Sequence, residues 1–274
     1  MRPISAVSLF ALLCILAASQ SLAQTPTTTL GPPTELQFKA RVDGSTQLYL
    51  EMLPVGFEKS QTHSLLIALH GGGCDRRQYA TDSRGECRGA RDVAAKYNMI
   101  YICPDLRGED SDMGPKAEAD LLQIIRTARK KYKIDRVFLV GASLGACNSL
   151  SFTALHPELI NGVSAQNAHV NYFYDHDKTV SDSLGGLPKD MPLEYKRRSA
   201  EYWPERFTMP VAITVGGKDP VVPPDSARRF IAVLQAMGEK ALLIDRPENS
   251  HMTSYEDTVA ALEFVVKSAT PDLK

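Results

Sequence analysis

Short apolar runs alternate with amphipathic stretches along most of this chain, and this alternation constrains the fold more than any other feature. The runs with the length and composition of β-strands are residues 47–52, 65–69, 99–103, 137–140, 211–215 and 241–244. Most of them are continuously apolar, which is typical of strands covered on both faces. The sequence therefore predicts a sheet with helices on each side.

Helical patterns separate these runs. Apolar residues recur at helical spacing within residues 118–132, 227–237 and 254–266. A further helix is predicted at about residues 144–156, where Pro157 would end it. Ser254 followed by Asp257 resembles a capping box, and Gly238 stands where a helix would end. Strands that alternate with helices predict a mostly parallel α/β sheet. In such sheets functional residues gather at the carboxyl ends of the strands.

Composition bounds the size and the partners of this fold. The 274 residues are 43% hydrophobic and 23% charged, which predicts one large domain. The formal net charge is −1, so no long-range field favours a nucleic acid or an anionic membrane as a partner. The basic clusters at residues 129–131 and 196–198 are interpreted as solvated faces.

The N-terminus has a different character. Arg2 precedes an apolar segment at residues 7–18, and Ser21-Leu22-Ala23 follows with the small-x-small pattern of a cleavage site. Residues 1–23 are therefore predicted to be a signal peptide, and the protein to be secreted or periplasmic; the alternative is an uncleaved anchor. No later segment has the ~20 apolar residues of a membrane span. Residues 24–35 are expected to be a Thr/Pro-rich leader, and residues 36–274 the domain.

Loss of Cys14 with the signal peptide would leave Cys74, Cys87, Cys103 and Cys147. Four cysteines in an exported protein permit three complete pairings. Cys74 with Cys87 is the favoured pair because both fall in one loop rich in glycine and arginine. The other two read as small buried residues. No metal site is expected, because the chain has no C-x-x-C pair and no histidine cluster with ligand spacing.

Ser143 stands at the junction of a predicted strand and a predicted helix, within the pentapeptide from Gly141 to Gly145. A sharp turn at this junction would hold the serine hydroxyl outward, and only glycines on either side would allow the close backbone approach. A serine hydroxyl is a weak nucleophile that requires a base. Ser143 is therefore a candidate nucleophile, provided that the chain supplies the rest of the machinery.

His251 is the candidate base, since it lies in the loop between the last predicted strand and the last helix. Asp219, in the loop after the preceding strand, is the candidate acid that would orient the histidine. The competing carboxylates are Asp225, which is expected to cap a helix, Asp245 and Glu248. Structural or solvated roles are expected for His63, His156, His169 and His176.

Glycines follow the strand at residues 65–69, in the sequence His70-Gly71-Gly72-Gly73. Backbone amides there would stabilise a developing oxyanion together with the amide of Leu144, next to the nucleophile. Either Gly72 or Gly73 would be the donor. His70 is expected to steady the loop.

With these segments, LHGGG, VGASLGA, GGKDPVVP and ENSH, the chain resembles α/β-hydrolases from about Leu36 onward. It is similar to secreted esterases of the feruloyl-esterase and polyhydroxybutyrate-depolymerase-like group, and to prolyl-oligopeptidase-like hydrolases. The resemblance implies the α/β-hydrolase fold with a small cap, and ester hydrolysis through an acyl-enzyme without a cofactor. The chain is too short to hold a propeller, which disfavours a full prolyl oligopeptidase. Serine in place of cysteine disfavours dienelactone hydrolase.

The insertion at about residues 170–206 would form the cap. Its aromatic residues Tyr172, Tyr174 and Trp203 are candidate substrate contacts, although packing of the cap is an equal alternative. The expected partner is a small-molecule or polysaccharide-linked ester. A peptidase and a non-catalytic binding protein are the alternative functions. The sequence does not specify an oligomeric state.

Overall fold

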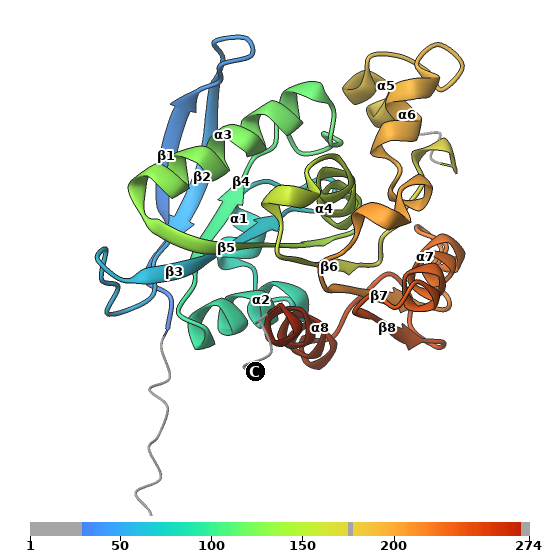
Figure 1. Cartoon of the computed structure of the whole chain (residues 1–274). Coiled ribbons are helices and arrows are strands. Elements are labelled where there is room, and N and C mark those ends of the chain that lie inside the picture. The colour runs from blue at the N-terminus through green and yellow to red at the C-terminus, as the bar shows by residue number, and fades with distance from the viewer. Residues whose placement is uncertain (1–28, 175–177, 270–274) are drawn as a thin grey trace, which may run out of the picture.

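The computed structural model describes residues 29–174 and 178–269 (Figure 1). The predicted signal peptide and residues 24–28 of the predicted leader lie outside the described residues. Within the rest of the leader, Leu30 bridges to Pro54 and the first strand already begins at Thr34. The domain therefore starts slightly earlier than expected from the sequence.

Eight strands form one sheet in the order β1-β2-β4-β3-β5-β6-β7-β8. The strands are β1 (Thr34–Lys39), β2 (Thr46–Met52), β3 (Thr62–Leu69), β4 (Ile100–Pro104), β5 (Lys133–Ala142), β6 (Gly162–Gln166), β7 (Val211–Gly216) and β8 (Ala241–Arg246). The pairs β1–β2 and β2–β4 are antiparallel, and all later pairs are parallel. The predicted mostly parallel α/β sheet is confirmed.

Two strands escaped prediction. β6 has the sequence GVSAQ and is buried throughout, but it lacks the apolar run that marks its neighbours. It pairs with β5 and β7 on its two sides, so backbone hydrogen bonding in the middle of the sheet compensates for its weak sequence signal. β1 is an edge strand with mostly exposed side chains.

The helices are α1 (Arg77–Thr81), α2 (Gly85–Lys96), α3 (Pro115–Lys131), α4 (Leu144–Leu155), α5 (Lys178–Leu184), α6 (Pro192–Arg198), α7 (Asp225–Ala236) and α8 (Tyr255–Ser268). The four predicted helices correspond to α3, α4, α7 and α8. The side chain of Ser254 caps α8 by accepting from the amide of Asp257, and Gly238 follows α7 with a φ of +85°. Both predicted end signals are confirmed.

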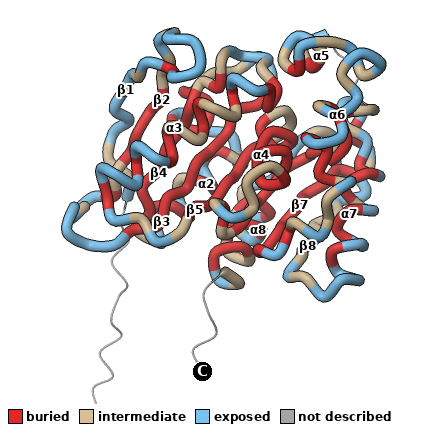
Figure 2. Tube along the Cα trace, turned by 45° about the horizontal axis from the view of Figure 1, so that its top comes forward, coloured by how far each residue is buried: buried red, intermediate tan, exposed pale blue. Residues whose placement is uncertain are grey.

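The strands bury alternate side chains in two separate apolar layers. In β3, Leu65 and Ile67 belong to the layer that contains residues of α3, α4 and α7, whereas Leu66 and Ala68 belong to the layer of α2 and α8. Figure 1 shows α2 and α8 below the sheet and α3 and α4 above it. Figure 2 shows the buried residues concentrated along the central strands and α4. Burial on both sides explains why these strands are continuously apolar.

The region of Cys74 and Cys87 differs from the prediction. Cys87 lies inside α2 and is completely buried, while Cys74 precedes α1 and is partly exposed. Both are free thiols, as are Cys103 and Cys147. The expected Cys74–Cys87 disulfide is therefore wrong, because the segment read as one loop folds in part into a helix that turns Cys87 toward the core.

Between β6 and β7 the chain forms α5, α6 and the short 3₁₀ helices η2 (Tyr172–Tyr174), η3 (Ala200–Tyr202) and η4 (Pro204–Arg206). A fourth 3₁₀ helix, η1 (Pro157–Leu159), follows α4. α6 packs against α4 (Figure 1). Arg198, at the end of α6, is fully buried and bonds to Glu118 of α3, so the solvated role expected for this basic cluster is wrong for Arg198.

The register of the sheet sets where the loops emerge. Leu69 at the end of β3 pairs with Gly141 of β5, and Gly141 pairs with Ala165 of β6. Gln166 pairs in turn with Thr214 of β7. The loops that follow these strands therefore leave the sheet at one edge, where the candidate site residues lie.

Candidate active site

Ser143 occupies the turn between β5 and α4, where its backbone has a φ of +54° and a ψ of −123°. This conformation is uncommon for a residue with a side chain and indicates local strain. A Cβ on Gly145 would lie 2.0 Å from the carbonyl oxygen of Leu69, and a Cβ on Gly141 would lie 2.4 Å from the backbone of Gly145. The steric reason predicted for the two glycines is confirmed.

Backbone hydrogen bonds hold Ser143 in this turn. Its amide donates to the carbonyl oxygen of Gln166 at the end of β6 (2.8 Å). Its carbonyl oxygen accepts from the amides of Ala146 and Cys147 in the first turn of α4 (2.9 and 3.0 Å). Ser143 thus lies at the N-terminus of a helix, where backbone amides favour negative charge.

The loops after β7 and β8 bring His251 and Asp219 together. Nδ1 of His251 lies 2.6 Å from Oδ2 of Asp219. The other carboxylate oxygen, Oδ1, accepts from the amides of Val221 and Val222 (2.8 and 2.9 Å), and the Asp219 side chain is 1% exposed. A carboxylate held in this way accepts from Nδ1 and leaves Nε2 of the neutral ring free to act as a base.

Two glycines allow these loops to touch. A Cβ on Gly216 would lie 2.1 Å from the carbonyl oxygen of Ser250, and a Cβ on Gly217 would lie 2.5 Å from that of Pro247. Any larger residue would push the loop of His251 away from the end of β7. The Gly-Gly pair just before Asp219 is thus part of what positions the histidine.

The competing carboxylates have other partners. Asp245 accepts two hydrogen bonds from Arg228, and Glu248 forms an ion pair with Lys218. Asp225 is the first residue of α7 and makes no capping hydrogen bond, so the capping role expected for it is wrong. It lies 3.4 Å from Arg228, one turn further along the helix.

Polar contacts also tie the loop of His251 to the strand ends beside Ser143. Nδ2 of Asn167, which follows β6, lies 3.3 Å from Oγ1 of Thr253, and this oxygen lies 2.8 Å from Oγ1 of Thr214. Within the described residues, no hydrogen bond joins His251 to Ser143. Catalytic hydrogen bonds are often long without substrate and tighten when it binds.

His70 steadies the loop after β3, as predicted. The ring is 2% exposed, and its two nitrogens lie 3.0 Å from the carbonyl oxygens of Gly71 and Asp105. Both ring nitrogens are therefore engaged by backbone, which suits a structural residue better than a second base.

The three glycine amides of this loop differ in their partners. The amide of Gly71 donates to the side chain of Gln78, and that of Gly73 donates to Oδ1 of Asp110, both at 2.7 Å. Among the described residues, no partner is recorded for the amide of Gly72, which lines the same cavity as Ser143 and Leu144. Gly72 thus has the amide available to a ligand.

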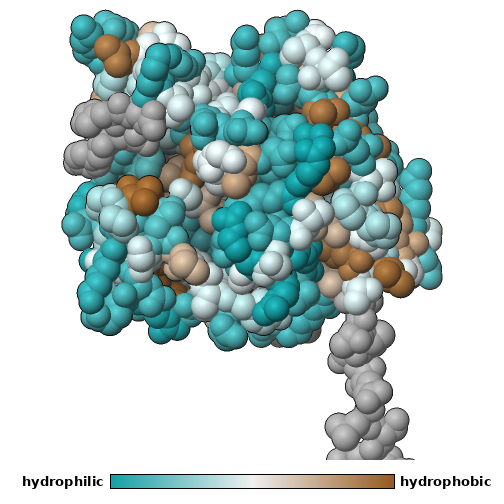
Figure 3. All heavy atoms as spheres, turned by 180° about the vertical axis from the view of Figure 1, so that it is seen from behind, coloured by the Kyte–Doolittle hydropathy of each residue, from teal (hydrophilic) through white to brown (hydrophobic). Residues whose placement is uncertain are grey.

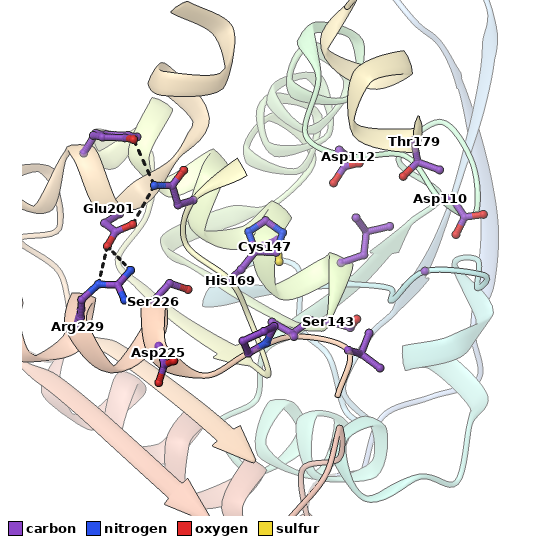
Figure 4. A pocket seen from close by; sticks show the side chains of 17 residues that line it. Asp110, Asp112, Ser143, Cys147, His169, Thr179, Glu201, Asp225, Ser226 and Arg229 are labelled. Carbon is purple, nitrogen blue, oxygen red and sulfur yellow. Dashed lines mark hydrogen bonds and ion pairs between the residues drawn. The ribbon is translucent and has the colours of Figure 1, made fainter. Parts of the chain in front are cut away.

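The cavity beside Ser143 has a volume of about 1090 Å³ (Figure 4). Its charged lining residues are Asp110, Asp112, Glu201, Asp225 and Arg229. Figure 4 shows Asp110, Asp112 and Thr179 on one side of Ser143, and Glu201, Asp225 and Arg229 on the other. The cavity is large enough for a ligand with two parts, one on each side of the serine.

A hydrogen-bonded group forms the wall around Glu201. Oε1 of Glu201 accepts from Nε and Nη2 of Arg229 (3.1 and 2.9 Å), and Oε2 accepts from Nδ2 of Asn171 (2.9 Å). The same Nδ2 lies 3.3 Å from the hydroxyl of Tyr202. These contacts link Asn171, just before η2, to η3 and to α7, and they fix the shape of this wall.

The aromatic residues predicted to contact substrate lie elsewhere. Tyr172 is 2% exposed and its hydroxyl donates to Asn148 (3.3 Å). Trp203 donates from Nε1 to the carbonyl oxygen of Lys196 and stacks with the guanidinium of Arg206. Neither ring lines the cavity, so packing, the alternative reading, describes both. The side chain of Tyr174 lies outside the described residues.

Sequence reasoning missed several lining residues. Tyr202 lines the cavity in place of the predicted rings, and His169 lines it although a structural or solvated role was expected. Cys147 also lines it, and its position one helical turn after Ser143 was a usable signal, since residues four apart share a helix face. No local pattern marks Glu201 or Arg229.

Among the described residues, no cluster of three or more His, Cys, Asp or Glu side chains is placed to hold a metal ion. No helix within residues 29–174 and 178–269 has the length and apolarity needed to cross a bilayer.

Comparison with known proteins agrees with this architecture. A family model described as the α/β hydrolase fold matches residues 66–198, which include the glycines at 71–73 and Ser143. No curated protein matches the sequence.

Solved structures share the fold at low sequence identity. Acylaminoacyl peptidase from Pyrococcus horikoshii is 16% identical with a TM-score of 0.67, covering 90% of this chain and 43% of that one. FphF, a fluorophosphonate-binding serine hydrolase from Staphylococcus aureus, is 15% identical (TM-score 0.65, covering 88% and 100%). A ferulic acid esterase from Anaeromyces mucronatus is 17% identical (TM-score 0.62, covering 88% and 91%).

This chain therefore spans less than half the length of the peptidase and most of the length of the other two proteins. Identities this low report the fold and leave the substrate open. The family match, the strand order and the turn at Ser143 agree with one another, and the chain has the α/β-hydrolase fold.

Proposed function

We propose that this protein is a serine hydrolase that cleaves carboxylic esters through an acyl-enzyme on Ser143. One observation carries the proposal: the His251–Asp219 pair, 2.6 Å apart, lies on the loops after β7 and β8, at the sheet edge where Ser143 is held in a strained turn and lines a cavity. The chain order Ser143, Asp219, His251 is that of α/β-hydrolases.

In the first step, Nε2 of His251 removes the hydroxyl proton as Oγ of Ser143 forms a bond to the carbonyl carbon of the ester. The π electrons of the carbonyl move to its oxygen, which becomes an oxyanion. Asp219 stays ionised and stabilises the imidazolium through Nδ1.

The oxyanion then collapses, the bond to the alcohol oxygen breaks, and His251 returns its proton to the leaving alcohol. The acyl group remains on Ser143. Water repeats the sequence with His251 as base, which releases the carboxylic acid and regenerates the serine.

Leu144 and Gly72 are the proposed amide donors to the oxyanion. Both line the cavity beside Ser143, while the amide of Gly73 already has the carboxylate of Asp110 as its acceptor. Loss of one such donor typically lowers kcat by about 10²–10³-fold. The proposal thus selects Gly72 over Gly73.

Export is the proposed location, on the basis of the N-terminal signal pattern at residues 1–23. Edman sequencing of the protein recovered from the culture medium or the periplasm should begin near Gln24. A chain that begins at residue 1 or 2 in the cytoplasm would contradict export.

The function is tested with the short activated ester p-nitrophenyl acetate and a fluorophosphonate probe. The Ser143→Ala variant should lose both turnover and labelling while its circular dichroism and melting temperature stay the same. Ser60→Ala, a change at an exposed serine outside the cavity, is the matched control and should behave as wild type. Turnover by Ser143→Ala at the wild-type rate would overturn the assignment.

The same reagents separate the alternatives. A binding protein that has lost activity should not react with the probe. A peptidase would hydrolyse an acylaminoacyl amide in preference to acetyl, feruloyl and hydroxybutyryl esters presented at equal concentration. We expect the esters to be preferred, and acyl groups carried on polysaccharides are the natural substrates that the proposal favours.

A further inference from the structure

A second cavity, of about 750 Å³, adjoins the catalytic one. The two cavities share Asp110, Asp112 and Thr179 in their linings, so they are two parts of one cleft. The remaining walls of the second cavity come from the turn before β2, the start of α3 and the end of α5. A short ester would fill the first cavity alone, since about 300–1,000 Å³ holds a small ligand.

The chemistry of the second cavity is polar and nearly balanced in charge. Hydroxyl and amide side chains such as Ser45, Gln47 and Ser183 line it, and no aromatic ring does so among the described residues. The hydroxyl of Ser45 is already hydrogen-bonded within the protein. Nε2 of Gln47 donates to that hydroxyl, and the side-chain oxygen of Gln47 is available to other partners. Such a surface offers hydrogen bonds rather than apolar contact.

The cations of this cavity are engaged by carboxylates. Arg107 bonds to Asp43 (2.8 Å) and to Asp120 (2.8 Å), and Lys116 lies 3.4 Å from Asp43. Neutralised cations give little attraction to an anionic ligand. A neutral polyhydroxylated chain meets the remaining donors and acceptors without the desolvation cost of a charge.

The turn after β4, part of which lines the second cavity, has a strained backbone. Leu106 and Arg107 have φ values of +48° and +79°, and Gly108 follows with +145°. A left-handed backbone is unfavourable for residues other than glycine, and such residues cluster at ligand sites. This strained turn after β4 leads directly to Asp110, which lines both cavities and holds the amide of Gly73 in the oxyanion loop.

We infer that the second cavity is a subsite for a neutral oligosaccharide chain on the alcohol side of the scissile ester. Figure 4 places the shared residues on one side of Ser143, and the wall of Glu201 and Arg229 on the other. Val221, Val222 and Pro223 also line the first cavity and offer apolar contacts to an acyl group. With the ester carbonyl at Ser143, the acyl group would lie toward Glu201 and Arg229, and the sugar chain would lie toward the second cavity.

This inference rests on the proposed ester hydrolysis, and the test separates the two. The substrates are p-nitrophenyl acetate, which reports the chemistry alone, and acetylated xylohexaose. The variants are Gln47→Leu, which keeps the size of the side chain and removes its hydrogen bonds, and Gln61→Leu as the matched control in the exposed turn before β3.

For Gln47→Leu, the ratio of kcat/KM on the acetylated oligosaccharide to kcat/KM on p-nitrophenyl acetate should fall about tenfold, mainly through KM, as the loss of about 1.4 kcal/mol of hydrogen bonding requires. Gln61→Leu should leave the ratio unchanged. An unchanged ratio in Gln47→Leu would overturn the subsite. Failure of the wild type to hydrolyse p-nitrophenyl acetate would instead overturn the proposed function.

A binding measurement makes the test independent of turnover. Deacetylated xylohexaose should bind to the Ser143→Ala variant in calorimetry, and at least fivefold more weakly when Gln47→Leu is added. Absence of binding, or equal binding by both proteins, would refute the inference. Tighter binding of a hexapeptide than of the oligosaccharide would assign the cavity to a peptide chain and overturn it as well.

Discussion

Asp219 uses each of its carboxylate oxygens for a separate purpose. Oδ1 accepts from two backbone amides of its own loop, and Oδ2 meets His251. The first set of bonds fixes the side chain, and the fixed side chain orients the imidazole. The proposed mechanism therefore depends on a carboxylate that accepts from Nδ1 of His251.

The Asp219→Asn variant tests this dependence. An amide group in this position can donate to Nδ1 and so favour the wrong tautomer of His251, and kcat should fall by about 10³–10⁴-fold. Steady-state kinetics on p-nitrophenyl acetate would measure the loss. Asp245→Asn, in the adjacent strand β8 and paired with Arg228, is the control and should stay within about twofold of wild type. A loss of similar size in both variants would argue against a specific role for Asp219.

Three helices meet at one partly buried carboxylate. Glu118 of α3 lies 2.8 Å from Nε2 of His156, at the end of α4, and 2.7 Å from Nη2 of Arg198 in α6. Burial alone would raise the pKa of Glu118, but the bond to His156 and the charges of Arg198 and Arg197 outweigh burial and lower this pKa to about 2. At the scale of elements, this cluster holds α6 and the adjacent insertion against the body.

Stability should therefore depend on pH through Glu118. Because its folded pKa is lowered, the carboxylate stabilises the fold above its unfolded pKa of 4.5, and this contribution is lost as the pH falls from about 4.5 toward 2. The difference corresponds to about 3 kcal/mol of unfolding free energy. Urea unfolding at a series of pH values should show this loss, and Glu118→Gln should remove it.

The control for this measurement is Glu205→Gln, a change at an exposed carboxylate of η4. Its pH profile should match that of the wild type. If Glu118→Gln kept the full wild-type dependence between pH 4.5 and 2, the cluster would not be the source of the acid sensitivity.

The molecule as a whole is held together by two apolar layers on a single sheet, without covalent cross-links among its described cysteines. Seen from behind in Figure 3, hydrophilic residues predominate and hydrophobic ones are scattered in small groups. With a net charge of −1, the surface has no strong overall field. A core of this size does not depend on disulfides, which smaller exported domains use to compensate for limited burial.

Thiol chemistry tests this description. In the native protein a maleimide should label Cys74 first, because it is partly exposed, whereas burial raises the pKa of Cys87 to about 12 and shields it. In guanidinium without reductant, Cys74, Cys87, Cys103 and Cys147 should all react, as peptide mass spectrometry would report. Reductant should leave the melting temperature unchanged. A Cys74–Cys87 disulfide peptide in a non-reducing digest would contradict the fold around α2.

Sequence patterns were sufficient for the features that depend on neighbours along the chain. Short apolar runs predicted six of the eight strands, and the central ones are continuously apolar because both of their faces are buried. The glycines around Ser143 predicted the sharp turn, because a Cβ on Gly145 would meet the backbone of β3 and a Cβ on Gly141 would meet the backbone of Gly145. Asp219 and His251 were predicted from their loops after consecutive strands, and the parallel sheet brings those loops to one edge.

Tertiary structure alone decided which side chains surround the cavity and which groups remain available to a ligand. Tyr172 turned into the core while Tyr202 reached the cavity, although both come from the same insertion. Asp110, more than thirty residues away in the sequence, accepts from the amide of Gly73, so that the amide of Gly72 is the one available to a ligand. Local sterics act between adjacent residues and can be read from the sequence, whereas these outcomes depend on packing between distant segments, whose geometry exists only in the folded chain.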